Sequence, residues 1–235
     1  RSTLFPYTTL FRSLFIGSPV VVGRSEKMSK SKKNVIDPNP IIANYGADTA
    51  RWFMLSDSPP DRDLEWTTAG VEGAAKFTQR LWRLITERLS ALPAAGTPMP
   101  ASIDARCEPL RRATHKTIAG VTDDIEKFHF NKAVARLYEF VNTMTEFVGT
   151  NGTPDALSGR AWSVREAFET LTRLIGPMMP HLAEELWKRL GHSQLLVETP
   201  WPEADRRLTV DDSVTIAVQV DRKSTRLNSS HLFIS

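Results

Sequence analysis

The 235-residue sequence lacks features that define several classes of protein. Its single cysteine, Cys107, excludes a disulfide framework and a zinc site built on cysteine pairs. No stretch approaches about 18 uninterrupted apolar residues, so the sequence predicts neither a transmembrane helix nor a membrane partner. No GxxxxGK[ST] or GxGxxG phosphate-binding pattern is present, and residues 1–13 do not form a signal peptide. The expected compartment is the reducing cytoplasm.

What the sequence does contain is an ordinary globular composition. Hydrophobic residues make up 41% and charged residues 24%, and 11 Phe with 6 Trp suffice for a packed core. The length allows one large domain or two small ones.

The two ends differ from the rest. Residues 3–13 and 221–231 back-translate in a single frame into the strings of short-read sequencing adapters, and neither end shows a helical or strand period. We therefore expect 1–13 and 221–235 to be adapter artefacts around residues 14–220. Because the sequence also lacks an initiator methionine, we expect a fragment of a longer protein.

This expectation changes the meaning of the net charge of +3. Arg1 and Arg12 contribute +2 and residues 221–235 contribute another +2, which leaves −1 for residues 14–220. Global basicity therefore gives no indication of nucleic-acid binding, and an RNA interface must be argued from local patches.

The remaining pattern predicts a mainly α fold. Residues 14–23 and 214–220 read as short strands, and Asp37 followed by Pro38 predicts a helix start, with Gly46 at its end. A second short helix is expected over 47–55. Longer amphipathic helices are expected over about 68–91, 104–127, 131–148 and 161–175, with a last helix to Leu190. Their spacing predicts an antiparallel bundle.

The apolar face of each helix gives a predicted core. Its members are Leu81, Ile118, Leu137, Val141, Leu171 and Leu186. Five tryptophans could instead be platforms on which bases stack, but their places beside apolar helical positions favour packing: Trp52, Trp66, Trp82, Trp162 and Trp187.

One short segment carries a chemical signal. Residues 27–31 read KMSKS and place two ammoniums and two hydroxyls within five residues of a predicted loop. Such groups suit an anion whose charge develops during reaction, for example a triphosphate under attack. A lysine-rich solvated loop is the alternative interpretation.

The surrounding sequence favours the phosphate interpretation. Residues 26–48 read EKMSKSKKNVIDPNPIIANYGAD, which resembles the signature loop of class I aminoacyl-tRNA synthetases and the stem-contact helices that follow it. The KSKKN form and the segments DTARWFMLSDSPPDRDLEW, HKTIAGVTDDI, FNKAVA and MMPHLAEELW resemble the leucyl enzymes, over nearly all of 14–220.

The resemblance implies a division of the chain. Residues 14–66 would be the end of a Rossmann-type catalytic domain with the KMSKS loop and stem-contact helices. Residues 67–200 would be an anticodon-binding-like bundle, and 201–220 the start of a truncated C-terminal domain with one strand.

It also implies roles for residues and partners. Lys27 and Lys30 would be catalytic, and the ATP-binding loop would comprise Lys27, Met28, Ser29, Lys30 and Ser31. The implied reaction joins leucine to tRNA(Leu) through leucyl-adenylate, with Mg²⁺ accompanying ATP, in a monomer. Asn34 and Asp37 would support the loop. Because the sequence holds no HIGH-type motif and no amino-acid pocket, we expect the fragment alone to be inactive.

Outside the loop, four cationic candidates lie close together on the helix expected over 104–127. Arg and Lys contact tRNA phosphates without reading sequence, so this row predicts a tRNA contact, with a solvated face as the alternative: Arg111, Arg112, His115 and Lys116. We predict no metal site, because the histidines lack ligand spacing and the adjacent Asp123 and Asp124 diverge around the helix. Both aspartates are expected to face solvent or to cap N–H groups.

Two other functions stay open. The chain could be a stand-alone helical tRNA-binding module, or it could derive from another class I synthetase, such as the valyl or isoleucyl enzyme.

Overall fold

The computed structural model describes residues 28, 29, 31, 35–150, 158–210, 219–220 and 223–224. Within these residues the chain is mainly helical, which confirms the predicted mainly α character. The strand expected over 14–23 lies outside the described residues, as do residues 1–13.

Two short helices precede the bundle. Helix α2 spans Pro38–Tyr45 and helix α3 spans Ala47–Asp57. The prediction for Asp37 is confirmed, because its carboxylate accepts a hydrogen bond of 2.9 Å from the Asn39 backbone N–H and caps α2. Gly46 alone separates the two helices. Its backbone angles, φ 87° and ψ 153°, lie in a region that residues other than glycine essentially do not adopt.

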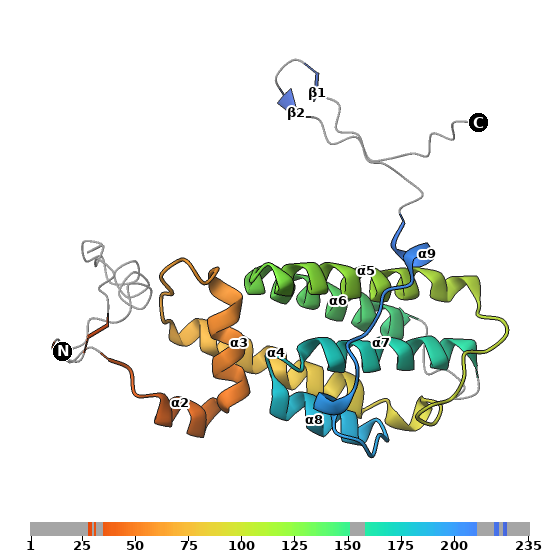
Figure 1. The fold of residues 1–235 in the computed structure, drawn as a ribbon, viewed down its shortest axis with the longest axis horizontal. Coiled ribbons are helices and arrows are strands. Elements are labelled where there is room, and N and C mark those ends of the chain that lie inside the picture. Colours follow the sequence, from red (N-terminus) through yellow and green to blue (C-terminus); the bar gives the residue numbers. More distant parts are fainter. Residues whose placement is uncertain are drawn as a thin grey trace.

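The bundle is formed by helices that follow α3 in the sequence. They are α4 (Thr68–Thr86), α5 (Glu108–Glu126), α6 (Phe130–Thr150), α7 (Gly159–Ile175) and α8 (Pro180–Arg189). Figure 1 shows α5 and α6 side by side along the long axis, with α7 beside them, while α3 runs across this direction. Thr67 and Ser158 cap α4 and α7 through their hydroxyls.

Several boundaries differ from the sequence prediction. Helix α4 ends at Thr86, and Leu89–Ala91 form the separate 3-10 turn η1, whose Ala91 is buried. Residues Ala105–Cys107 form a second such turn, η2, capped by Asp104. Helix α6 begins before Asn131, because the His129 carbonyl already accepts hydrogen bonds from Lys132 and Ala133. Two further short elements follow the bundle: η3 (Leu196–Glu198) and α9 (Arg206–Thr209).

The predicted core is confirmed. Leu81, Leu137, Val141, Leu171 and Leu186 are fully buried and Ile118 is 3% exposed. Of the five tryptophans, Trp52 and Trp187 are buried, and Trp66 and Trp82 pack against the core from its edge. The interpretation of these four as packing residues therefore holds.

The interpretation of Asp124 as a solvent-facing or capping residue is wrong. Its side chain is buried and its Oδ2 accepts a hydrogen bond of 2.6 Å from Arg136 Nε. The neighbouring Asp123 is exposed and pairs with Lys127 at 2.6 Å, as expected for a surface helix position. Adjacent helical residues diverge as predicted, but one of them points at α6 instead of water.

A pair of two-residue strands lies near the C-terminus. Strands β1 (Gln219–Val220) and β2 (Lys223–Ser224) are antiparallel, with Gln219 opposite Ser224. Strand β1 falls within the strand predicted over 214–220. Residues 214–218 of that predicted strand lie outside the described residues. Strand β2 lies within 221–235, where the sequence pattern indicated no strand.

Candidate functional site

The KMSKS loop is only partly described. Lys27, Lys30 and Asn34 lie outside the described residues, so their predicted roles stay predictions. Met28 is exposed, and the hydroxyls of Ser29 and Ser31 are 2.7 Å apart, which brings the two serines onto one side of the segment. This hydrogen bond is compatible with a tight loop that presents polar groups together.

Helix α2, which follows the loop, is weakly packed. None of its residues is buried, and Ile42 is 46% exposed. Ile41 and Tyr45 reach the edge of the core. Helix α2 is joined to α3 at Gly46, so its location depends also on how Gly46 and the first turn of α3 are held.

That first turn is held by a carboxylate. Asp48 is 8% exposed and its Oδ2 accepts a hydrogen bond of 2.7 Å from the Leu182 backbone N–H in α8. Its Oδ1 accepts one from Arg51 Nη2 at 2.5 Å and lies 2.9 Å from His181 Nδ1. Burial by itself raises the pKa of Asp48, but the hydrogen bonds from His181, Leu182 and Arg51 outweigh it, and the pKa lies below its ordinary value.

Helix α3 is also fixed through an aromatic cluster. Trp52 is fully buried and stacks on Phe77 of α4, with ring centroids 5.1 Å apart. Its Nε1 donates a hydrogen bond of 3.1 Å to the Tyr138 hydroxyl of α6. Helix α3 therefore contacts α4, α6 and α8 and belongs to the bundle as a packing unit.

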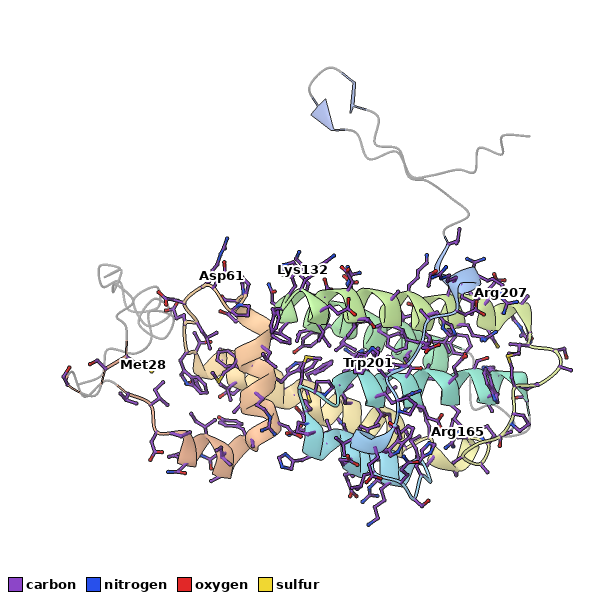
Figure 2. All side chains as sticks on the ribbon, in the orientation of Figure 1. Met28, Asp61, Lys132, Arg165, Trp201 and Arg207 are labelled. Carbon is purple, nitrogen blue, oxygen red and sulfur yellow. The ribbon has the colours of Figure 1, made fainter. Side chains whose placement is uncertain are left out.

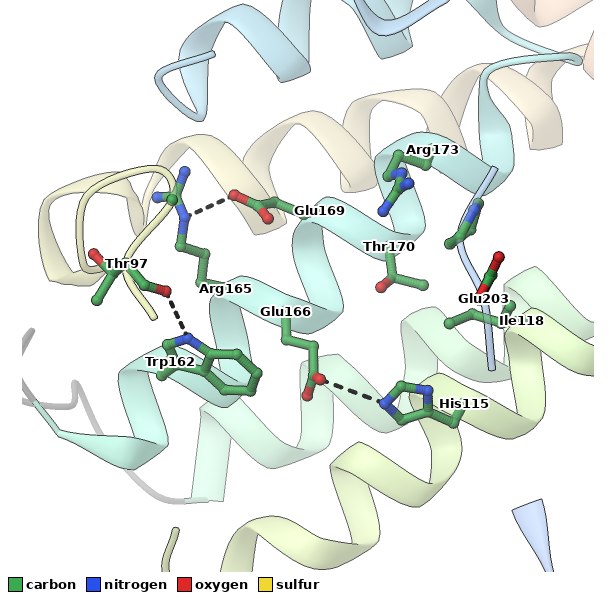
Figure 3. Close-up of a pocket in the computed structure, with 12 residues that line it drawn as sticks. Thr97, His115, Ile118, Trp162, Arg165, Glu166, Glu169, Thr170, Arg173 and Glu203 are labelled. Atoms are coloured by element: carbon green, nitrogen blue, oxygen red, sulfur yellow. Dashed lines mark hydrogen bonds and ion pairs between the residues drawn. The ribbon is translucent and has the colours of Figure 1, made fainter. Parts of the chain in front are cut away.

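The four predicted tRNA-contact residues do not share one environment. Arg111 donates to both carboxylate oxygens of Glu166 in α7, at 2.9 and 3.2 Å, and its guanidinium lies over the Trp162 ring. His115 Nε2 lies 3.4 Å from the same carboxylate (Figure 3). The structure thus places Arg111 and His115 on the side of α5 that packs against α7.

His115 also joins the C-terminal segment to the bundle. Its Nδ1 accepts a hydrogen bond of 3.1 Å from the Asp205 backbone N–H, which assigns the ring proton to Nε2, facing Glu166. Burial raises the pKa of Glu166, but the hydrogen bonds from His115 and Arg111 outweigh it and the pKa lies below its ordinary value. Glu166 is therefore an ionised tie between α5 and α7.

Arg112 and Lys116 each follow Arg111 and His115 by one residue and so lie about 100° further around α5. Arg112 Nε donates to Glu108 at 2.9 Å and its Nη1 donates to the Val210 carbonyl at 2.7 Å. Lys116 is half-buried. Helix α9 packs along α5 here and adds Arg206 and Arg207, both exposed. Figure 2 shows Arg207 and Met28 toward opposite ends of the long axis.

A cleft of about 310 Å³ lies between α5, α7 and the segment after η3. Two of its carboxylates are paired: Glu169 with Arg165 at 2.7 Å, which also lines the cleft, and Glu166 with Arg111 at 2.9 Å. Arg165 also donates to the Pro93 and Leu190 carbonyls, and Arg173 donates to the Pro200 carbonyl. These charges hold the elements together, and the arrangement contains no activated nucleophile.

Sequence reasoning missed Asp48, Glu166 and the contribution of α9. Asp48 and Glu166 bind partners 134 and 55 residues away, and no local period reveals such a partner. Arg206 and Arg207 follow Asp205, which accepts a hydrogen bond from the Arg207 backbone N–H, a helix-start signal that the sequence displayed.

Comparison with protein families gives two matches. The family described as the anticodon-binding domain of tRNA ligase matches residues 109–229, and the class I tRNA synthetases for I, L, M and V match residues 2–67. The chain belongs to the family of tRNA ligase anticodon-binding domains, within the class I synthetases.

Among individual relatives, leucine–tRNA ligases resemble the chain strongly. Those of Parvibaculum lavamentivorans and Paramagnetospirillum magneticum are 56% and 58% identical over 207 residues, which cover 88% of this chain and 23% of each relative. That of Rhodospirillum centenum is 51% identical over 231 residues, covering 94% of this chain and 27% of the relative. The resemblance to leucyl enzymes is thus confirmed, and the chain spans about a quarter of the length of these relatives.

A solved structure is also similar. It is the ternary complex of Agrobacterium radiobacter K84 agnB2 LeuRS with tRNA and LeuAMS, with a TM-score of 0.71 and 29% identity over 86% of this chain and 25% of that one. In the part of the chain that the structure describes, no helix has the length and apolar character that crossing a membrane requires.

Proposed function

We propose that the chain is part of an enzyme that uses ATP to attach leucine to tRNA(Leu) through leucyl-adenylate. The observation that carries this proposal is the 51–58% identity to leucine–tRNA ligases over 88–94% of the chain. The match of residues 2–67 to class I synthetases supports it, because this range includes KMSKS. The enzyme is expected to act as a cytoplasmic monomer.

In this function Lys27 and Lys30 stabilise the charge that develops on the ATP phosphates, and Met28, Ser29 and Ser31 shape the loop. Two hydroxyls held 2.7 Å apart fit a loop that surrounds a polyanion. The Mg²⁺ arrives bound to the phosphates of ATP and belongs to the substrate.

For tRNA, the outer side of α5 supplies the phosphate contacts, through Arg112 and Lys116 together with Arg206 and Arg207 of α9. Helices α5 and α9 contact each other, Arg112 binds the Val210 carbonyl just after α9, and the two α9 arginines are exposed. Arg111 and His115 support this surface from behind by their bonds to Glu166. Such contacts give affinity that depends on salt and little sequence readout.

The proposed domain limits follow the resemblance to class I synthetases, and α3, which packs on the bundle, joins the first unit to the second. Residues 14–66 end the catalytic domain, 67–200 form the bundle and 201–220 begin a further domain.

The test is Lys30→Ala in a full-length enzyme that carries this segment. Leucine-dependent exchange of pyrophosphate into ATP should fall about a hundredfold, as when one donor to a developing oxyanion is removed. Lys132→Ala is the control, because Lys132 is an exposed lysine on α6 (Figure 2) and exchange should persist.

Two outcomes would decide against the proposal. Unchanged exchange in Lys30→Ala with a collapse of tRNA affinity would make the loop an RNA-binding patch, as in the stand-alone module. Exchange that responds to valine or isoleucine and not to leucine would assign the segment to another class I enzyme.

A further inference from the structure

Helix α8 begins without a cap of its own. Its N-cap residue, Met179, provides no side-chain hydrogen bond, and Pro180 occupies the first helical position. The third helical residue is Leu182, whose backbone N–H would have no partner within the helix. Asp48 supplies that partner from α3, at 2.7 Å. One carboxylate thus caps α8 from 134 residues away in the sequence.

The same carboxylate lies in the first turn of α3. It therefore meets the positive ends of two helix dipoles, α3 and α8, and both favour its charged form. Arg51 and His181 bind its Oδ1 from the solvent side. These contacts fix the beginning of α3 on the bundle far more closely than the apolar packing of an exposed helix end would.

On the other side of this point α2 contacts α3 and α4, and it reaches the edge of the core only through half-buried side chains, Ile41 and Tyr45. Gly46 occupies a backbone region that only glycine adopts readily, and α2 beyond it has no buried residue. The KMSKS loop is joined to α2 through residues 32–37. The location of α2 relative to the bundle therefore depends on where Asp48 holds the start of α3.

We propose that Asp48 is a positioning residue for the ATP-binding loop: by capping α8 it fixes the point from which Gly46, α2 and the loop extend. This inference rests on the proposed function. Asp48 touches no reacting atom, and its removal should displace the loop without removing a phosphate ligand. A misplacement of about 1 Å at such a distance can cost about a hundredfold in rate.

Two variants of Asp48 separate the contributions. Asp48→Asn keeps an oxygen that accepts from Leu182 but brings an amide donor toward Arg51 and His181. Asp48→Ala removes every bond. Asp104→Ala is the matched control, because Asp104 also accepts a backbone N–H and an arginine, but both come from Arg106, two residues away.

The first measurement needs no activity. Spin labels are attached to Ile42→Cys in α2 and Lys188→Cys in α8, in a Cys107→Ala background. They report the distance between α2 and α8. Both labelled side chains are exposed. We expect one narrow distance distribution for the unaltered protein, and a broadened or shifted one for Asp48→Ala, with Asp48→Asn between them and Asp104→Ala unchanged. An unaltered distribution in folded Asp48→Ala would overturn the proposal.

The second measurement is kinetic, in the full-length enzyme. Asp48→Ala should slow leucyl-adenylate formation about tenfold to a hundredfold at saturating ATP, with leucine affinity unchanged. Transfer of preformed leucyl-adenylate to tRNA should keep its rate. If Asp48→Ala lowers the melting temperature but leaves the rate of adenylate formation unchanged, Asp48 is only a structural cap and the proposal is wrong. Lys30→Ala, measured alongside, tests the proposed function separately, so failure of either is recognisable.

Discussion

Helices α2 and α3 are neighbours in the sequence but differ in how deeply they are buried in the structure. Only Gly46 lies between them, yet α2 has no buried residue while α3 buries Asp48, Thr49, Trp52 and Phe53. Both read as short helices in the sequence. The difference arises because α3 has partners far away in the chain, namely Phe77, Tyr138 and Leu182. Helix α2, which follows the KMSKS segment in the sequence, has no such partners that bury it.

The largest effect is expected at Trp52. Trp52→Ala removes a fully buried ring that stacks on Phe77 and should lower the free energy of unfolding by about 3–5 kcal/mol. Ile42→Ala on α2 is the counterpart and should cost less than about 0.5 kcal/mol, because Ile42 is 46% exposed. Urea unfolding of the two variants measures both. Equal costs would break the contrast between the helices.

The joint between the helices gives the next effect. Gly46→Ala meets no atom within 4 Å, so its cost comes from φ of 87° alone and should be about 1–3 kcal/mol. Gly73, on the exposed face of α4, also has no atom within 4 Å of an added Cβ. Gly73→Ala should therefore stabilise by about 0.5–1 kcal/mol, because alanine suits a helix interior. Thermal unfolding should show opposite signs, and a loss in both would mean that φ is not the cause.

The sequence predicted these helices because local signals mark them: Asp37 with Pro38 at the start of α2, Gly46 at its end, and period-3.6 apolar positions in the bundle. It could not predict which short helix is buried, because burial depends on tertiary partners. The KMSKS segment was found from composition and resemblance. The sequence could not predict that Arg111 is paired within the bundle, because its partner Glu166 lies 55 residues away and arginine occurs on any face of an amphipathic helix.

Acid should weaken both ties that the sequence missed. The pKa values of Asp48 and Glu166 lie below their ordinary values of 3.8 and 4.5. Each carboxylate therefore contributes stability above its unfolded pKa, and this contribution is lost as pH falls through the lower folded pKa. Unfolding followed between neutral pH and about pH 2 should show the loss below about pH 4.

Two variants sharpen this result. Glu166→Gln should flatten the acid dependence, because the titrating group that ties α5 to α7 is gone. Asp123→Asn should change it little, since the Asp123–Lys127 pair is exposed and screened by water. If the free energy of unfolding of Glu166→Gln depends on pH as it does in the unaltered protein, the contacts of Arg111 and His115 with residue 166 do not need its negative charge.

The smallest effect concerns tRNA and extends the contrast from α2 and α3 to the two sides of α5. In a full-length enzyme, Arg112→Ala and Arg206→Ala should each weaken tRNA(Leu) binding about two- to fivefold and reduce the salt slope by about one, as the loss of one phosphate contact does. Arg111→Ala should lower stability instead and leave the salt slope unchanged, because Arg111 lies between α5 and α7, bound to both oxygens of Glu166 and over the Trp162 ring. Arg189→Ala on α8, whose guanidinium pairs with Glu185, is the control for a loss of charge elsewhere. Binding measured at several salt concentrations separates these variants. An equal loss of slope for Arg111→Ala and Arg112→Ala would place tRNA on both sides of α5 and contradict the orientation proposed for the helix.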